Sequence, residues 1–176
     1  MTSNHAGLAT IEPLAHDGGH SADNGARQAG NAIIIDTRFG RFSFDPDSVL
    51  RLPNGLPGFL HEREFALASF PDARLRGFKL LQSLERPDLS FIVVPLGTDN
   101  GMIQPQDVTE VLDNLSIDGE DAAFLLIVTV RNDPDHGVLA TCNLRAPLVV
   151  DTRTRTAHQY VLRNDDYPIQ HPLAIN

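Results

Sequence analysis

The sequence lacks the features that several classes of protein require. A single cysteine among 176 residues, Cys142, excludes an internal disulfide and argues against a disulfide-stabilised secreted domain. The N-terminus has neither the basic region nor the apolar stretch of a signal peptide. The longest apolar run, residues 122–128, is far too short to cross a bilayer. We therefore expect a soluble, cytoplasmic protein that does not use a membrane.

Motifs for catalysis and cofactor binding are missing as well. The chain has no Gly-x-Ser-x-Gly nucleophile elbow, no P-loop, no dinucleotide-binding glycine fingerprint and no zinc-binding spacing. Cys142 falls in a strand pattern, where a buried and unreactive thiol is expected. Asp151 and His158 flank Arg153-Thr154-Arg155, but no nucleophile stands at a defined spacing from them. These observations predict a protein without enzymatic activity, cofactor or metal.

Positive charge is scarce. Lys and Arg number 14 against 23 Asp and Glu, so that the formal net charge is -9 and the pI is near 5.1. Binding to a phosphate backbone draws its energy from Lys and Arg, so nucleic acid is not expected as a direct partner. Between Arg86 and Arg131 there is no basic residue at all, although acids are frequent there. Such acidity speeds the encounter with basic partners.

Residues 1–31 differ in composition from the rest of the chain. They are rich in Ala, Gly, Asn and His and show no apolar periodicity, which predicts a disordered N-terminal tail. His5, His16, Asp17 and His20 could bind a transition metal, but their spacing matches no standard site, and a solvated polar tail is expected instead. Apolar segments begin at residue 32, so residues 32–176 are predicted to form the folded domain.

The domain contains many short segments typical of strands. Residues 32–37 and 41–44 flank Phe39-Gly40 as in a hairpin. Gly, Pro, Asn or Asp separates most of the further candidates, which are 49–52, 64–69, 77–83, 89–96, 122–131, 138–144, 148–152 and 157–163. This pattern predicts a mostly β fold, a small antiparallel β-barrel-like domain or a strongly bent sandwich.

One segment, from Pro105 to about residue 116, predicts a helix. Val108, Val111, Leu112 and Leu115 follow the i, i+3, i+4, i+7 spacing of a stripe that faces a core. Proline suits the first turn of a helix, where its missing N–H is not needed.

Acidic residues line the side of this helix opposite the apolar stripe and continue beyond its end. No base stands four residues from any of them, so the acids gain nothing from ion pairs along the helix. One interpretation is a solvated face, and the other is a docking face for a basic partner. The residues around Gly119 could instead bind a hard cation, but they lack the alternating ligands of an EF-hand loop. The acids concerned are Asp107, Glu110, Asp113, Asp118, Glu120 and Asp121.

Residues 52–59, Leu-Pro-Asn-Gly-Leu-Pro-Gly-Phe, combine two turn signals with large apolar side chains. Asn54-Gly55 and Pro57-Gly58 favour reversal of the chain, because Gly accepts positive φ and Pro fixes φ. We expect a rigid corner between the strands at 49–52 and 64–69, with Leu56 and Phe59 closing one end of the barrel. A contact loop is the alternative.

The order of several segments resembles the FliW family of flagellar assembly factors. After residues 35–37 and 52–59 come Glu-Phe-Ala-Leu at 64–67, Leu-Leu-Gln-Ser at 80–83 and Leu-Ser-Phe-Ile-Val-Val at 89–94. Residues 140–150, 159–162, Tyr167 and 171–173 continue the match, which spans about residues 33–173. The motif residues for which a structural role is expected are Asn54, Gly55, Pro57, Gly58, Phe59, Gln82, Ser83, Asn143, Leu144, Ala146 and Pro147.

This resemblance implies a compact antiparallel β fold without enzymatic activity and with two cytoplasmic protein partners. One partner is flagellin, held before export, and the other is the RNA-binding translational repressor CsrA, which FliW proteins sequester until flagellin accumulates. The acids at 107–121 suit the basic CsrA, because complementary charge speeds encounter and sets register. The chain departs from the family after Pro95, where residues 97–102 lack the usual aromatic anchor.

Two alternatives remain. A small barrel that binds a nucleotide or a flavin would use Arg153, Arg155 and His158, since Arg can clamp phosphate. An export chaperone that binds flagellin alone is the other.

Overall fold

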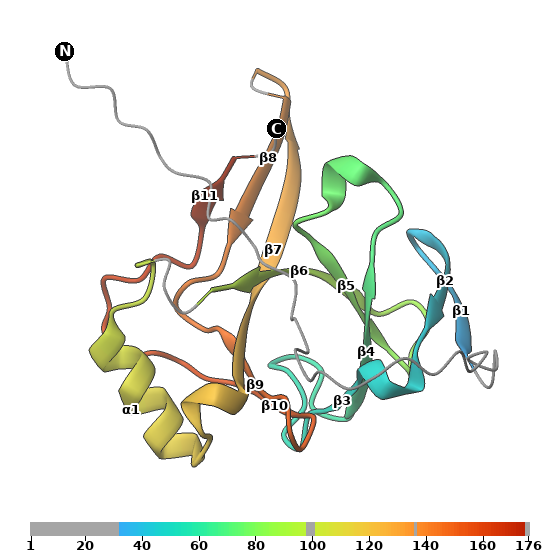
Figure 1. The fold of residues 1–176 in the computed structure, drawn as a ribbon. Coiled ribbons are helices and arrows are strands. Elements are labelled where there is room, and N and C mark those ends of the chain that lie inside the picture. Colours follow the sequence, from blue (N-terminus) through green and yellow to red (C-terminus); the bar gives the residue numbers. More distant parts are fainter. Residues whose placement is uncertain (1–31, 98–100, 136, 175–176) are drawn as a thin grey trace, which may run out of the picture.

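The computed structural model describes residues 32–97, 101–135 and 137–174 (Figure 1). The predicted tail, with its histidines and Asp17, lies outside the described residues, as do residues 98–100 of the segment that departs from the family. The described elements are β1 (Ile33–Thr37), β2 (Gly40–Phe44), β3 (Val49–Arg51), β4 (Glu64–Ser69), β5 (Lys79–Ser83), β6 (Ser90–Leu96), α1 (Pro105–Leu115), β7 (Ala122–Asp133), β8 (Gly137–Cys142), β9 (Leu148–Asp151), β10 (Thr156–Gln159) and β11 (His171–Leu173), with short 3-10 turns that include η3 (Gly119–Asp121).

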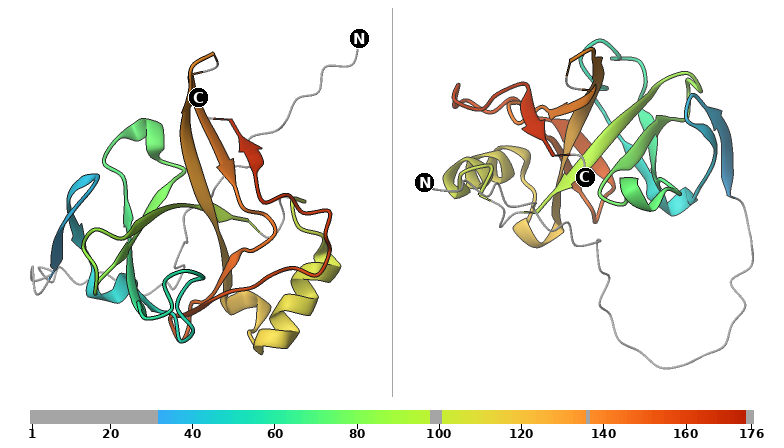
Figure 2. Two further views of the ribbon diagram at one scale, coloured as in Figure 1. Left: turned by 180° about the vertical axis from the view of Figure 1, so that it is seen from behind. Right: turned by 90° about the horizontal axis from the view of Figure 1, so that it is seen from above.

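Seven strands close into a ring. Hydrogen-bonded neighbours follow the order β7-β6-β5-β4-β3-β10-β9, and β9 pairs again with the start of β7. Figures 1 and 2 show these strands curving around a common centre. β8 pairs with the far end of β7, and β11 pairs with β8, so these two strands extend from the ring. The prediction of a mostly β, barrel-like fold with one helix is confirmed.

The ring has one parallel seam, which the expectation of an antiparallel barrel missed. β10 joins β3 through a single residue pair, Thr156 with Arg51, and the two strands run in the same direction. The Arg51 N–H also donates to the Arg155 carbonyl at 2.8 Å. The direction in which two distant strands meet is set by how the ring closes, and neither strand's own pattern of side chains encodes it.

Several ring strands, namely β5, β9 and the first half of β7, are covered on both faces. Phe65 and Leu81 point into the ring, while their neighbours Ala66 and Leu80 pack under the β1–β2 hairpin with Phe44. On the other side, Leu125 points into the ring and the residues next to it in β7 pack under α1. Successive side chains of a strand point to opposite faces, so a strand covered on both faces reads as a continuous apolar run. The apolar runs in the first half of β7 and in β9 therefore follow from the outer cover that α1 provides.

The helix α1 covers one flank of the ring. Val111 is buried, and the other residues of the predicted stripe are partly buried against the same cluster. Pro105 is in the first turn, and the helix ends at Leu115. The next residue, Ser116, caps it: its φ of 55° is left-handed, and its N–H donates to the carbonyls of Leu112 and Asp113. Among the described residues no helix has the length and hydropathy needed to span a membrane.

Ten strands lie where the sequence predicted them, with two differences near the C-terminus. β10 ends at Gln159 because the next residue would face Pro147, which has no N–H for the ladder. β11 was not predicted, since three residues around Pro172 are too short for a periodic signal and a proline normally argues against a strand.

Candidate functional site

Residues 52–59 form a tight corner whose apolar side chains enter the core. Leu56 and Phe59 exchange two backbone hydrogen bonds, of 3.2 and 2.7 Å. Leu56 is 2% exposed inside the ring, and Phe59 packs edge-on against Phe91 with ring centroids 5.6 Å apart. Gly55 and Gly58 have φ values of +63° and +87°. A Cβ at Gly55 would lie 2.5 Å from the Phe59 carbonyl oxygen, so only glycine fits there.

The Gln82-Ser83 pair organises the turn that follows β5. The side-chain amide of Gln82, fully buried, donates to the carbonyls of Ser83 and Leu89, each at 2.9 Å. The Ser83 hydroxyl oxygen accepts from the N–H groups of Glu85 and Arg86 at 3.3 and 3.1 Å. The buried side chains of Gln82 and Ser83 thus form hydrogen bonds with backbone groups of the turn, which have no partner in the sheet.

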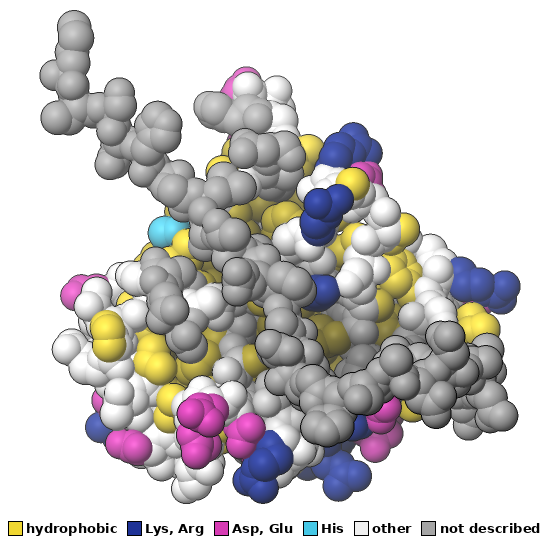
Figure 3. All heavy atoms as spheres, viewed as in Figure 1, with side chains coloured by type: hydrophobic (Ala, Val, Ile, Leu, Met, Phe, Trp, Pro, Cys, Tyr) yellow, Lys and Arg dark blue, Asp and Glu magenta, His cyan; other side chains and the backbone are white. Residues whose placement is uncertain are grey.

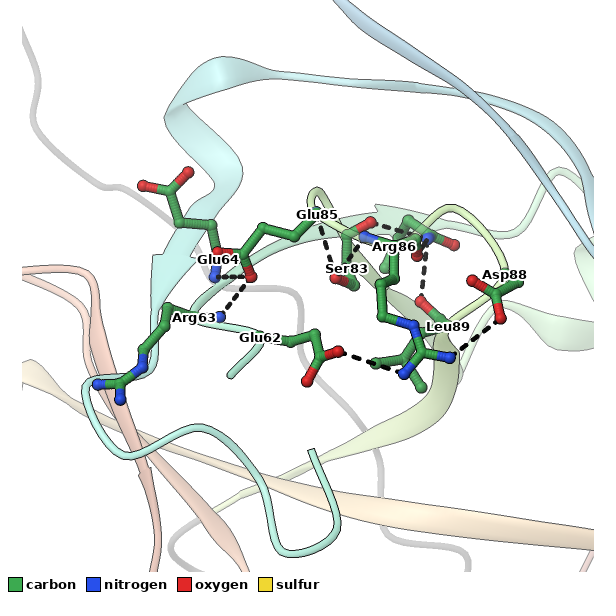
Figure 4. Close-up of polar contacts among 9 residues, drawn as sticks. Glu62, Arg63, Glu64, Ser83, Glu85, Arg86, Asp88 and Leu89 are labelled. Carbon is green, nitrogen blue, oxygen red and sulfur yellow. Dashed lines mark hydrogen bonds and ion pairs between the residues drawn. The ribbon is translucent and has the colours of Figure 1, made fainter. Parts of the chain in front are cut away.

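The turn after β5 also contacts residues 62–64, which lead from the corner into β4, as Figure 4 shows. The Glu85 carboxylate accepts from the backbone N–H of Arg63. The Arg86 guanidinium donates to Glu62 at 3.2 Å and to Asp88 at 3.1 Å. The hydrogen bond from Arg86 lowers the pKa of Asp88. The motif residues Gln82 and Ser83 therefore belong to a polar network that reaches Glu62 and Arg63, between the corner and β4.

Two acids of α1 bind side chains from near the C-terminus. The Tyr167 hydroxyl donates to the Asp107 carboxylate and accepts from the Gln104 N–H at 2.8 Å. Burial, followed by the bond to Asp107, raises the pKa of Tyr167. The Arg163 Nε lies 3.0 Å from the Glu110 carboxylate. Asp107 and Glu110 are thus less open to a partner than the helical pattern alone suggested.

The expectation that the acids lack partners therefore needs correction. The sequence argument considered bases four residues away along the helix, and none is there. The partners come instead from residues about 50 to 60 positions later, which the fold brings onto the helix. Asp121 likewise pairs with Arg153, whose Nε is 3.3 Å from its carboxylate. Contacts at such separations leave no periodic signal in the sequence.

Residues 160–168 run along α1 in the opposite direction to the helix. The Tyr160 hydroxyl accepts from the Asn114 amide at 2.8 Å, so contacts recur at Tyr160, Arg163 and Tyr167. Sequence reasoning placed Asn114 in the helix and Tyr160 and Arg163 in a strand. It assigned no contact to any of the three, because contacts between residues so far apart leave no local pattern.

The motif at 143–147 holds this segment from its other side. The Asn143 side chain accepts from the Ala146 N–H at 3.0 Å and shapes the turn. The Arg145 guanidinium donates to the Asn164 carbonyl at 3.1 Å and pairs with Asp165. The Arg145 carbonyl accepts from the Leu162 N–H at 2.9 Å. Leu144 and Pro147 are buried beside them.

Three of the predicted acids remain exposed and without an ion pair among the described residues. Asp113 is on the outer side of α1, and Asp118 and Glu120 are at the following turn η3. The Asp118 carboxylate accepts only from the Glu120 N–H, at 3.3 Å. Figure 3 shows acidic side chains gathered over α1 and this turn. This face, which we call the acidic face (Asp113, Asp118 and Glu120), is the part of the predicted site that stays open to a partner.

The described residues do not bring together the ligands that the cation and nucleotide alternatives require. Within the described ranges no three His, Cys, Asp or Glu side chains are placed to hold a metal ion. Arg155 pairs with Asp47 at 3.1 Å, and Arg153 is turned toward Asp121. His158 belongs to β10 opposite Val149 and does not line the shallow hollow beside Arg155. The structure therefore does not bring the three proposed phosphate ligands together.

The strand ring, the corner at 52–59 and the acidic face together define a small β protein of the kind that binds partners through its surface. The FliW protein family model matches residues 33–173, the span over which the resemblance was drawn from the sequence. The chain is 35% identical over 143 residues to the flagellar assembly factor FliW of Oceanobacillus iheyensis, covering 78% of this chain and 90% of that one. It is 34% identical over 146 residues to the flagellar assembly factor FliW of Bdellovibrio bacteriovorus, covering 80% and 78%.

A solved structure agrees with these relatives. The crystal structure of the flagellar assembly factor FliW matches with a TM-score of 0.62 and 32% identity over 80% of this chain and 96% of that one. The chain belongs to the FliW family, as the resemblance predicted.

Proposed function

We propose that this protein is a flagellar assembly factor without enzymatic activity, which binds flagellin before export and sequesters the translational regulator CsrA. In this scheme accumulating flagellin occupies the protein, CsrA is released, and flagellin synthesis stops. The observation that carries the proposal is family membership over nearly the whole described domain. Relatives that carry the assembly-factor name match this chain over about four fifths of its length.

The acidic face supports a basic partner such as CsrA. Asp113, Asp118 and Glu120 are exposed, and no base of the described residues neutralises them. Complementary charge at an interface raises the rate of encounter and sets the orientation of the partners more than it adds affinity. An acidic protein of net charge -9 also repels RNA, so it would compete for CsrA by contact with the protein.

Titration calorimetry of CsrA against a double variant tests this proposal. Asp113→Lys with Glu120→Lys reverses two charges that have no ion-pair partner in the described structure, so folding should be unaffected. Each exposed pair contributes roughly 0.2–1 kcal/mol, and reversal adds repulsion, so we expect about 10-fold weaker binding. The dependence of the affinity on salt should also fall.

A matched control separates a local effect from net charge. Glu64→Lys with Asp135→Lys makes the same change in charge at exposed positions in β4 and the β7–β8 turn, where neither acid has an ion pair among the described residues. This control should bind CsrA within about 3-fold of the unmodified protein, as expected for charges outside the contact. Equal weakening by both pairs of substitutions would remove the acidic face from the interface.

The flagellin-only chaperone makes a different prediction. Co-purification from a cytoplasmic lysate would then recover flagellin but not CsrA. Recovery of both proteins, with added flagellin releasing CsrA, is the result that the proposal requires.

A further inference from the structure

The corner contains Asn54-Gly55, a dipeptide that can react with itself. Gly has no side chain to shield its backbone nitrogen, so that nitrogen can attack the carboxamide of the preceding Asn. The Gly55 N then bonds to the Asn54 Cγ and gives up its proton to the amino group, which leaves as ammonia, and a five-membered succinimide results. Water opens either carbonyl of this ring and yields Asp, or isoAsp, in which the main chain passes through Cγ.

The turn around Asn54 keeps the two reacting atoms apart. The Gly55 N–H donates to the Leu52 carbonyl at 2.9 Å, so residues 52–55 form a β-turn with Pro53 and Asn54 at its centre. The φ of Asn54 is negative, which makes the turn type I and its ψ about 0°. Ring closure needs the Gly55 N beside the Asn54 Cβ, a rotation of about 120° around the Cα–C bond from this conformation.

The packing of the corner opposes that rotation. Rotation breaks the Gly55–Leu52 hydrogen bond and moves Gly55, where even an added Cβ would lie 2.5 Å from the Phe59 carbonyl oxygen. It also displaces Leu52 and Leu56, which are 0% and 2% exposed in the core of the ring. The Asn54 carboxamide itself is partly exposed and makes no hydrogen bond with the described residues. The backbone of the corner therefore decides whether the reaction occurs.

We propose that Asn54 is a deamidation site, which the closed corner protects and which local opening of the corner exposes. Parts of a folded protein open at a lower free energy than the whole, and each opening of the corner frees the Gly55 N to attack. An isoAsp product lengthens the main chain before Gly55 by one atom, so the Gly55 N–H no longer meets the Leu52 carbonyl in a type I turn. Deamidation thus makes a reversible opening permanent, independently of the partners proposed above.

Peptide mapping by mass spectrometry tests the protection. The full chain is kept in mildly alkaline buffer with and without enough urea to unfold it, and conversion of Asn to Asp or isoAsp is followed with time. In urea Asn54 should convert at a rate similar to those of Asn24 and Asn100, which are also followed by Gly and lie outside the described residues. In buffer alone Asn54 should convert at least about 100-fold more slowly than in urea. A ratio below about 10-fold would overturn the proposal.

A matched pair of substitutions tests whether the corner itself provides the protection. Phe59→Ala removes the ring that packs against Phe91 and loosens the Leu56–Phe59 pair, whereas Leu60→Ala removes a neighbouring side chain that is 57% exposed. In buffer Asn54 should convert about 10-fold faster in Phe59→Ala and within about 2-fold of the unmodified rate in Leu60→Ala. If the alanine variant fails to fold, Phe59→Leu should give a smaller increase. An unchanged rate in the folded Phe59 variant would refute the role of the corner.

Val111→Ala separates local opening from unfolding of the whole domain. Val111 is buried in the cluster under α1, which does not include the residues of the corner. Its truncation should lower the free energy of unfolding, measured in urea, and leave the corner packed, so Asn54 should convert at nearly the unmodified rate. If conversion instead rises in step with the loss of global stability in both Val111→Ala and Phe59→Ala, Asn54 is exposed by global unfolding and the proposal is wrong.

Discussion

Substitution of the two corner glycines tests whether the tight approach at residues 55–60 sets the fold. Both residues have positive φ, so alanine is strained at either position. They differ in their surroundings, because a Cβ at Gly55 would lie 2.5 Å from the Phe59 oxygen and 2.7 Å from the Leu60 Cα, whereas one at Gly58 meets nothing within 4 Å. Gly58→Ala is therefore a matched control for Gly55→Ala.

The expected magnitudes follow from this difference. The left-handed conformation costs a residue with a Cβ roughly 1–2 kcal/mol, and the lower entropy of the unfolded chain offsets roughly 0.4–1 kcal/mol of that cost. Gly58→Ala should thus lower the free energy of unfolding by about 1 kcal/mol. Gly55→Ala must also displace backbone atoms and open the Leu56–Phe59 pair, whose two hydrogen bonds are worth roughly 0.5–1.5 kcal/mol each. We expect a loss of about 3 kcal/mol or more.

Urea denaturation provides the assay. With a slope of roughly 2 kcal/mol/M, the midpoint should fall by about 0.5 M for Gly58→Ala and by at least about 1.5 M for Gly55→Ala. The slope should stay unchanged, because the folded state keeps its buried area. Equal losses for the two variants would refute the reasoning, since they would mean that the backbone around Gly55 yields at no cost.

Two further predictions concern buried groups. Tyr167→Phe removes the hydroxyl between Gln104 and Asp107 and should lower the free energy of unfolding by about 1–2 kcal/mol in the same assay. Tyr160→Phe, which loses only the exposed bond to Asn114, should cost about 0.5 kcal/mol or less, and the reverse order would contradict the role of Tyr167. Burial raises the pKa of Cys142 to about 11, so the thiol should resist iodoacetamide at about pH 8 until urea unfolds the protein. Rapid labelling of the native protein would show that Cys142 is not enclosed.

Sequence alone was sufficient for features that depend on neighbouring residues. Strand positions followed from apolar segments bounded by turn residues, and α1 from the spacing of Val108, Val111, Leu112 and Leu115. The corner followed from Gly55 and its neighbours, because positive φ is a property of single residues. Each of these signals acts over a few positions along the chain.

Tertiary structure alone decided how these elements meet. The parallel join of Thr156 to Arg51 and the pairing of Asp107 and Glu110 with residues of the C-terminal segment depend on closure of the ring, and the short strand β11 forms only because β8 offers it an edge. Closure brings together side chains that are 50 or more positions apart, and no local preference of either partner records such a meeting. A helix can therefore be predicted from its own sequence. The packing of the rest of the chain decides which of its charged side chains remain without an ion pair.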